Sequence, residues 1–129
     1  MLHARHWTLE QANGALPFVG ATVRRLRAAR RRLAVEDFDT DFPVHAEATG
    51  GAWPGPERAR AALDVALCFE RLERLEIVVR DLERGLVDFP AVRDGDEVYL
   101  CWLLDEPAIE HWHHIEAGFA GRRPLDLPR

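Results

Sequence analysis

The spacing of apolar residues in two separate segments constrains this fold most strongly. In the first segment the apolar residues recur three and four positions apart, and Arg30 alone breaks the series. They are Leu9, Ala12, Leu16, Val19, Val23, Leu26 and Leu33. The second segment repeats the spacing with Ala61, Val65, Cys68, Leu72 and Leu75. This heptad pattern is typical of helices that pair through one apolar stripe, as in a coiled coil. The sequence therefore predicts a long antiparallel helical hairpin.

Local signals give approximate bounds for both helices. Thr8 and Gln11 have the spacing of a capping box, and Trp7 precedes the cap where a hydrophobic staple would lie. Pro17 lacks an N–H group, so we expect a bend or a new segment there and predict a bent helix over about residues 9–35. Residues 36–56 are acidic and then rich in Gly and Pro, which predicts a flexible loop. The second helix is expected over residues 57–76.

A β-hairpin is predicted after the helices. Asp94-Gly95 separates the apolar runs "LVDFPAV" and "EVYLCWLL", which is the strongest short-range hairpin signal. With a two-residue loop, Arg93 faces Asp96. The same count places Ala91 opposite Val98, Phe89 opposite Leu100 and Asp88 opposite Cys101. Pro90 predicts that the first strand lies at a sheet edge at that point.

Two further segments complete the predicted architecture. Ile77, Val78 and Val79 are β-branched and favour a strand, although the helical period can be continued through Leu82. Near the C-terminus, Pro107 suits a first helical turn and Gly118 a helix end, so we expect a C-terminal helix between them. The predicted fold class is α+β: a helical hairpin, a small antiparallel β-sheet and a C-terminal helix. A chain of 129 residues suits a single domain spanning residues 1–129.

The motifs of residues 81–125 resemble a known family. The segment "DLERGLVDFPAVRDGDEVYLCWLLDEPAIEHWHHIEAGFAGRRPL" is similar to the series "GLVDFP", "VYLCW", "GEPEI", "WHE" and "GFAGR" of the bacterial domain of unknown function 2203 family. The opening "TLEQANGALPFV" also resembles that family. The chain differs in having Asp105 and Glu76 where the family usually has Gly, and His114 where an acidic residue is usual. The resemblance implies a fold and a set of positions, and no activity.

The histidines of "EHWHHIEAG" divide into two kinds on the expected helix. Ile109, Trp112 and Ile115 would form its apolar face, with His111 and His114 opposite in solvent. His113 would lie at the edge of that face. Its spacing from Glu110 and from Glu116 is that of carboxylate–histidine metal sites on bundle helices. The alternative is a boundary histidine bonded to a carboxylate or a backbone carbonyl.

Asp88 is the second candidate, because it lies between Val87 and Phe89 in an apolar strand, where a carboxylate needs a partner. Together with Cys101, Glu110, His113 and Glu116 it offers a ligand set for a divalent transition metal such as zinc. The alternative is a structural carboxylate that ties down the hairpin or accepts from Arg122 or backbone donors, with Cys101 as a small buried hydrophobe.

Charge and composition exclude several classes of function. The net charge is −5 and all 17 basic residues are Arg, so nucleic-acid binding is not expected, and the Arg cluster of residues 24–32 reads as a solvated helix face. The longest apolar run, "VYLCWLL", is too short to span a bilayer. Two cysteines make no disulfide framework, which favours a cytoplasmic protein. Nucleotide-binding loops, hydrolase elbows and CxxC pairs are absent from the sequence.

Two functions fit these observations. The leading hypothesis is a cytoplasmic interaction or assembly module that forms a homodimer, because a second hairpin would complete a four-helix bundle. The alternative is a small metal-binding protein or metal-dependent enzyme, with a carboxylate–histidine site between the β-hairpin and the C-terminal helix. The sequence predicts that such a site lies around Asp88 and His113.

Overall fold

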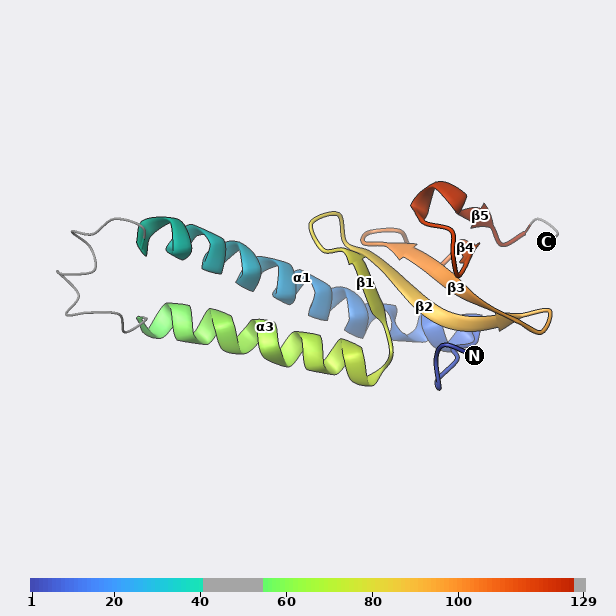
Figure 1. Cartoon of the computed structure of the whole chain (residues 1–129), viewed down its shortest axis with the longest axis horizontal. Helices are drawn as coiled ribbons and strands as arrows, with labels where there is room; N and C mark the ends of the chain where they lie inside the picture. Colours follow the sequence, from blue (N-terminus) through green and yellow to red (C-terminus); the bar gives the residue numbers. More distant parts are fainter. Residues whose placement is uncertain (41–54, 127–129) are drawn as a thin grey trace.

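The computed structural model of this chain describes residues 1–40 and 55–126. Two long helices lie side by side, and an antiparallel sheet packs on the N-terminal part of the first (Figure 1). The helices are α1 (Leu9–Thr40) and α3 (Pro56–Arg74). The strands are β1 (Val78–Asp81), β2 (Leu86–Arg93), β3 (Asp96–Leu103), β4 (His111–His114) and β5 (Arg123–Pro124), with the short 3-10 helix η1 (Phe119–Gly121) before β5. The α+β class and the paired helices are as predicted.

The predicted apolar stripes hold the helical pair together. Val19, Val23 and Leu26 of α1 have no exposed surface, and Cys68 and Leu72 of α3 are equally buried. These side chains belong to one hydrophobic cluster that continues into the sheet. Burial of this kind stabilises by roughly 1.5–3 kcal/mol for each large aliphatic side chain. Most stripe residues are therefore buried within the chain, against the partner helix and the sheet, although Leu9 remains 41% exposed.

The helix bounds differ from the prediction at three ends. Helix α1 runs without interruption through Pro17 and reaches Thr40, past the expected end at residue 35. Helix α3 begins at Pro56, which occupies the first helical position where its missing N–H costs nothing, and ends at Arg74. The loop predicted for residues 36–56 is therefore wrong at both ends, and its middle, residues 41–54, lies outside the described residues. The capping box is confirmed: Gln11 N donates to Thr8 Oγ1 at 3.1 Å, and Thr8 N donates to Gln11 Oε1 at 3.0 Å.

The sheet is an antiparallel meander in the order β1-β2-β3-β4-β5. The predicted hairpin register is confirmed along its whole length, from Arg93 opposite Asp96 back to Asp88 opposite Cys101. Asp94 and Gly95 both have positive φ, 52° and 84°, as a two-residue type I′ turn requires. The strand that the β-branched residues Ile77, Val78 and Val79 favoured is present: β1 begins at Val78, directly after Ile77.

Strand β2 lies between β1 and β3, but at Pro90 no described strand pairs with it on the β1 side. Strand β1 pairs with β2 only as far as Asp88, and beyond it Trp7 N donates to the Pro90 carbonyl at 2.7 Å. Because that carbonyl points away from β3, the pairs Pro90–Tyr99 and Asp88–Cys101 are of the non-hydrogen-bonded type, whose side chains approach most closely. The proline is thus placed where no ladder bond is lost.

The two faces of the sheet differ in chemistry. One face carries Val87, Phe89, Leu100, Trp102 and Trp112, which join the cluster shared with the helices. Because side chains alternate along a strand, the other face carries Asp88, Cys101, Tyr99 and His113. The sheet therefore separates an apolar layer from a layer of ionisable groups.

The predicted C-terminal helix is wrong. His111–His114 form strand β4, which pairs with β3, and only the 3-10 turn Phe119–Gly121 is helical in that region. Without β4, the edge of β3 would leave backbone N–H and C=O groups without partners next to the core. A four-residue strand supplies those bonds. It also buries Trp112 on the side of the sheet that faces the helices. The burial of Trp112 was predicted, but on the apolar face of a helix.

Residues at the N-terminus are held against the sheet by two carboxylates. Glu97 accepts hydrogen bonds from Leu2 N, His3 N and the His6 ring, and Glu76 accepts from Ala4 N and Arg5 N. Although loss of solvent opposes ionisation of Glu97, these donors lower its pKa to about 2. Of the described helices, neither has the length and apolar character that crossing a bilayer requires.

Two glycines in the turns of the sheet give a matched test of backbone and packing constraints. Gly85 and Gly95 both have positive φ, but a Cβ at residue 85 would lie 2.4 Å from Leu104 Cβ, whereas a Cβ at residue 95 meets nothing within 4 Å. We expect Gly95→Ala to cost about 1 kcal/mol through backbone strain alone. Gly85→Ala should cost about 3 kcal/mol because overpacking is added to that strain. Urea denaturation measures both, and equal costs would contradict the close approach of Leu104.

Candidate metal centre

Three neighbouring strands bring one carboxylate, one thiol and one imidazole together. Asp88 on β2 is the cross-strand partner of Cys101 on β3, and His113 on β4 lies one row further along the same face, opposite Tyr99. One potential ligand atom from each of the three residues lies within 4.8 Å of the others. Asp88, Cys101 and His113 are 0%, 1% and 3% exposed, so the group lies in the protein interior.

Asp88 is only partly satisfied by the described protein groups around it. Its Oδ2 accepts a hydrogen bond from Arg80 Nε at 2.8 Å and another from His113 Nε2 at 2.9 Å. Its Oδ1 is buried and has no hydrogen-bond partner among the described residues. A buried carboxylate oxygen without a partner is costly, which marks this atom as the place where a further ligand would be accommodated.

The hydrogen bonds of His113 determine its protonation. Nδ1 lies 2.7 Å from the His114 carbonyl oxygen, so it must carry a proton. Nε2 faces the Asp88 carboxylate, which also accepts only from a protonated nitrogen. Burial opposes the charge that results, but the bonds to Asp88 and to the His114 carbonyl together raise the pKa of His113. In the absence of a metal, the pair is an imidazolium held against a carboxylate.

Cys101 is a thiol in this environment. Burial, and then the negative charge of Asp88, raise the pKa of Cys101 to about 12. A thiol nucleophile needs a lowered pKa, so this cysteine is unsuited to nucleophilic catalysis by itself. Its ionisation requires a compensating positive charge at the site, and a bound metal ion supplies one.

A pocket of about 230 Å³ reaches the three residues. Arg80 and the segment from Ile115 to Phe119 line it along with the three candidate ligands. Two of the predicted ligands are not brought into the group. Glu116 lines the pocket but is exposed, and Glu110 is exposed just before β4, on the side of that strand opposite His113. The helical spacing that suggested both carboxylates does not exist in a strand.

Arg80 is the functional residue that the sequence reasoning missed. It lies on β1, and its guanidinium binds Asp88 and stacks 4.8 Å from the centre of the Tyr99 ring. The signal was present in the "VVR" run, because a strand beginning at Val78 places Arg80 on the same face as Asp88. His111 was expected in solvent, yet it is half-buried opposite Cys101, with its Nδ1 3.9 Å from a Glu106 oxygen.

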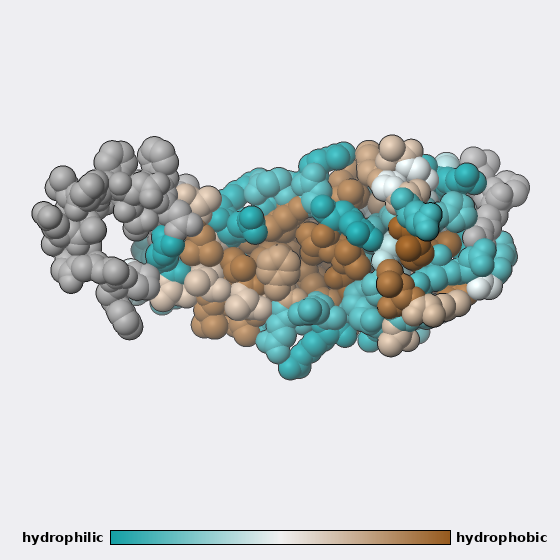
Figure 2. Space-filling view, viewed as in Figure 1, coloured by the Kyte–Doolittle hydropathy of each residue, from teal (hydrophilic) through white to brown (hydrophobic). Residues whose placement is uncertain are grey.

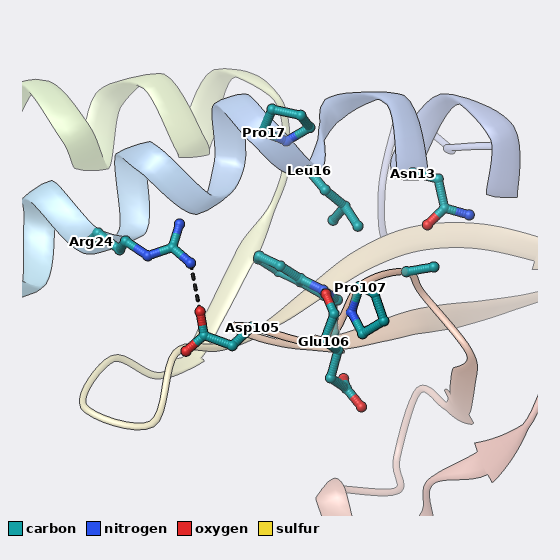
Figure 3. Close-up of a pocket in the computed structure, with 9 residues that line it drawn as sticks. Asn13, Leu16, Pro17, Arg24, Asp105, Glu106 and Pro107 are labelled. Carbon is teal, nitrogen blue, oxygen red and sulfur yellow. Dashed lines mark hydrogen bonds and ion pairs between the residues drawn. The ribbon is translucent and has the colours of Figure 1, made fainter.

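A larger pocket, of about 450 Å³, lies elsewhere, between α1 and the turn after β3. Figure 3 shows Asn13, Leu16 and Pro17 on α1 above Glu106 and Pro107 of that turn. The pair Arg24–Asp105 crosses its end, but both side chains are more than half exposed. No buried ionisable group is aimed into this pocket within the described chain, so its size carries less weight than the chemistry of the smaller one.

A comparison with protein families matches residues 5–125 to the family described as "Uncharacterized conserved protein (DUF2203)". The chain belongs to the DUF2203 family. Two of the motifs on which the resemblance rested contain candidate metal ligands: "GLVDFP" contains Asp88 and "VYLCW" contains Cys101. Comparisons with curated proteins and with solved structures gave no match.

Two positions at which the resemblance implied a glycine have backbone angles that favour glycine. Glu76 and Asp105, which stand where Gly is usual, have φ values of 56° and 80°. Glycine adopts this left-handed region without strain, and other residues enter it at a cost. In this chain the two positions lie in turns, one after α3 and one after β3, where a glycine would relieve backbone strain.

The protonated state of His113 predicts a pH-dependent stability. Because its folded pKa is raised above the ordinary value of 6.5, its contribution is complete below about pH 6.5 and is lost as the pH rises through the folded pKa. In metal-free protein, the difference in unfolding free energy between the wild type and His113→Gln should shrink over that rise. Urea denaturation at a series of pH values in a chelator measures it, with His114→Gln as the control. A difference that does not change with pH would contradict the ion pair.

Proposed function

We propose that this protein binds one divalent transition metal ion, with zinc as the best fit, through Asp88, Cys101 and His113. The observation that carries the proposal is the buried three-residue group, with ligand atoms within 4.8 Å of one another and one Asp88 oxygen that no described residue bonds. Carboxylate oxygen, thiolate sulfur and imidazole nitrogen are the donors that zinc takes in proteins. Three protein ligands leave a fourth position open, as in catalytic zinc sites.

The surroundings of the ligands support this assignment. Metal-bound histidines commonly donate their second ring N–H to a backbone carbonyl, which fixes the ring and leaves the other nitrogen for the metal. His113 makes that bond to the His114 carbonyl, so its Nε2 points into the group. Arg80 holds Asp88 through Oδ2 and leaves Oδ1 available. The three strands fix the ligand positions through backbone bonds and not through loop conformation.

Metal binding must displace protons at this site. In metal-free protein the Cys101 thiol keeps its proton, since its pKa is raised to about 12, and His113 is held as an imidazolium. Both groups have to be deprotonated to act as ligands, so affinity should fall as the pH falls. When bound, the metal would supply a Lewis acid at the open position. A thiolate ligand also requires a compartment that keeps thiols reduced, which supports a cytoplasmic location.

Elemental analysis tests the metal site directly. Protein purified without a histidine tag, loaded with zinc and freed of excess metal, should retain one zinc per chain. Cys101→Ser and Asp88→Asn should each weaken the affinity at least about tenfold, as loss of a metal ligand does. His114→Gln is the matched control, because that ring packs on Trp112 on the opposite face of β4. Circular dichroism checks that each variant is folded, and a wild type that retains no metal would overturn the proposal.

We also propose that two copies associate through their helical pairs. Phe18, Leu63 and Phe69 remain 47%, 57% and 41% exposed although they are large and apolar. Figure 2 shows hydrophobic residues gathered along the helical pair toward the sheet. The interface would use these residues, because most of the seam residues that first suggested a dimer are already buried within the chain. If these residues form one contiguous apolar patch, such a patch marks an interaction site.

Light scattering tests the dimer. We expect the mass of two chains at tens of micromolar, as an order of magnitude for a stable dimer, and a shift toward one chain for Phe69→Ser. Arg74→Ser is the control, since Arg74 is exposed on the same helix and pairs only with Glu70 in the described structure. Leu26→Asp is unsuitable, because Leu26 is fully buried and the change would unfold the chain. A wild type with the mass of a single chain would contradict the association.

A further inference from the structure

We propose that the open side of the metal centre binds a small oxyanion group, phosphate or carboxylate, which Arg80 and Arg84 recognise together with the metal. The inference rests on the proposed metal site and names the class of ligand that would occupy its open position. It is carried by three observations: the Arg80 side chain in the lining of the smaller pocket, the pocket's size, and the stacking of Arg84 on the lining residue Phe119.

Arg80 supplies the first positive charge. It lines the pocket beside Asp88, and its side chain remains 42% exposed even though its Nε is bonded to Oδ2. A guanidinium offers five N–H donors in a planar fork that matches phosphate and carboxylate oxygens. Once Asp88 and Cys101 have neutralised a divalent ion, the charge of Arg80 at this pocket is left for an anionic ligand.

Phe119 holds a second guanidinium next to the pocket lining. Its ring lines the pocket, and two guanidinium groups lie against that ring: Arg84, 4.7 Å from the ring centre, and Arg122, 5.2 Å from it. Arg122 is engaged by Glu106 and by the Cys101 carbonyl. Arg84 has no carboxylate partner among the described residues; its stacking on Phe119 positions it without neutralising it. Glu116 is the only carboxylate besides Asp88 in the described lining, and it is exposed.

The size of the pocket limits the ligand. About 230 Å³ is less than the 300–1,000 Å³ typical of sites that enclose drug-sized molecules. The space suits a single phosphate or carboxylate group and a short attached portion. A larger molecule would extend past Phe119 into solvent. The metal on one side and the guanidinium groups on the other would then hold the oxyanion from two directions.

Isothermal titration with inorganic phosphate tests the inference, with acetate titrated in parallel to separate the two oxyanion classes. The protein is first loaded with zinc, freed of unbound metal by gel filtration and analysed for zinc content. We expect saturable binding of one anion per chain and a loss of affinity of at least about tenfold for Arg84→Ala, the scale of one lost charge-assisted contact. Arg84→Lys should recover part of that affinity. Arg74→Ala, at the end of α3 and outside the pocket lining, should bind as the wild type does.

The outcomes separate the two proposals. Protein that carries stoichiometric zinc but binds neither anion overturns the oxyanion site and leaves the metal site standing. Binding that Arg84→Ala does not weaken also overturns it, because the anion would then lie elsewhere. Protein that takes up no zinc overturns both proposals. Anion binding that requires zinc and is weakened by Arg84→Ala supports the assignment.

Discussion

The face of the sheet opposite the helices depends on the burial of one carboxylate, Asp88. A fully buried aspartate is tolerated only when its charge is compensated by hydrogen bonds or opposite charges. Here the compensating groups lie on strands to either side of β2. Arg80 on β1 and His113 on β4 both bond to Oδ2, although the two residues belong to different parts of the chain. The face opposite the helices is therefore organised around this one group, and the thiol of Cys101 is held beside it.

The division of the sheet into two faces explains how a small chain combines stability with a polar interior. The apolar face and both helices share one hydrophobic cluster, so the fold does not rely on the ionisable face for its core. The ionisable face can therefore carry a group that the described residues satisfy only in part, Oδ1 of Asp88. Unsatisfied buried groups of this kind cluster at functional sites, which is why the metal and oxyanion proposals are placed there.

Part of the candidate site was predictable from the sequence because it depends on local geometry. Asp94-Gly95 fixes the turn type, the turn fixes the register, and the register sets Asp88 opposite Cys101. His113 was also named as a ligand, but for a helical spacing that does not exist. Its place in the site comes from strand pairing with Tyr99, and the same error added Glu110 and Glu116. Arg80 was missed because the boundary between the second helix and the first strand was left open.

The sequence by itself determined the helical stripes, the capping box, the hairpin register and the Asp88–Cys101 pair. Each of these follows from contacts between residues near in the chain or from the alternation of side chains in one element. Only the tertiary structure decided that residues 111–114 are a strand and that Arg80 reaches Asp88. The physical reason is that a four-residue segment has no strong preference of its own. It becomes a strand because the edge of β3 needs hydrogen-bond partners and Trp112 needs the core.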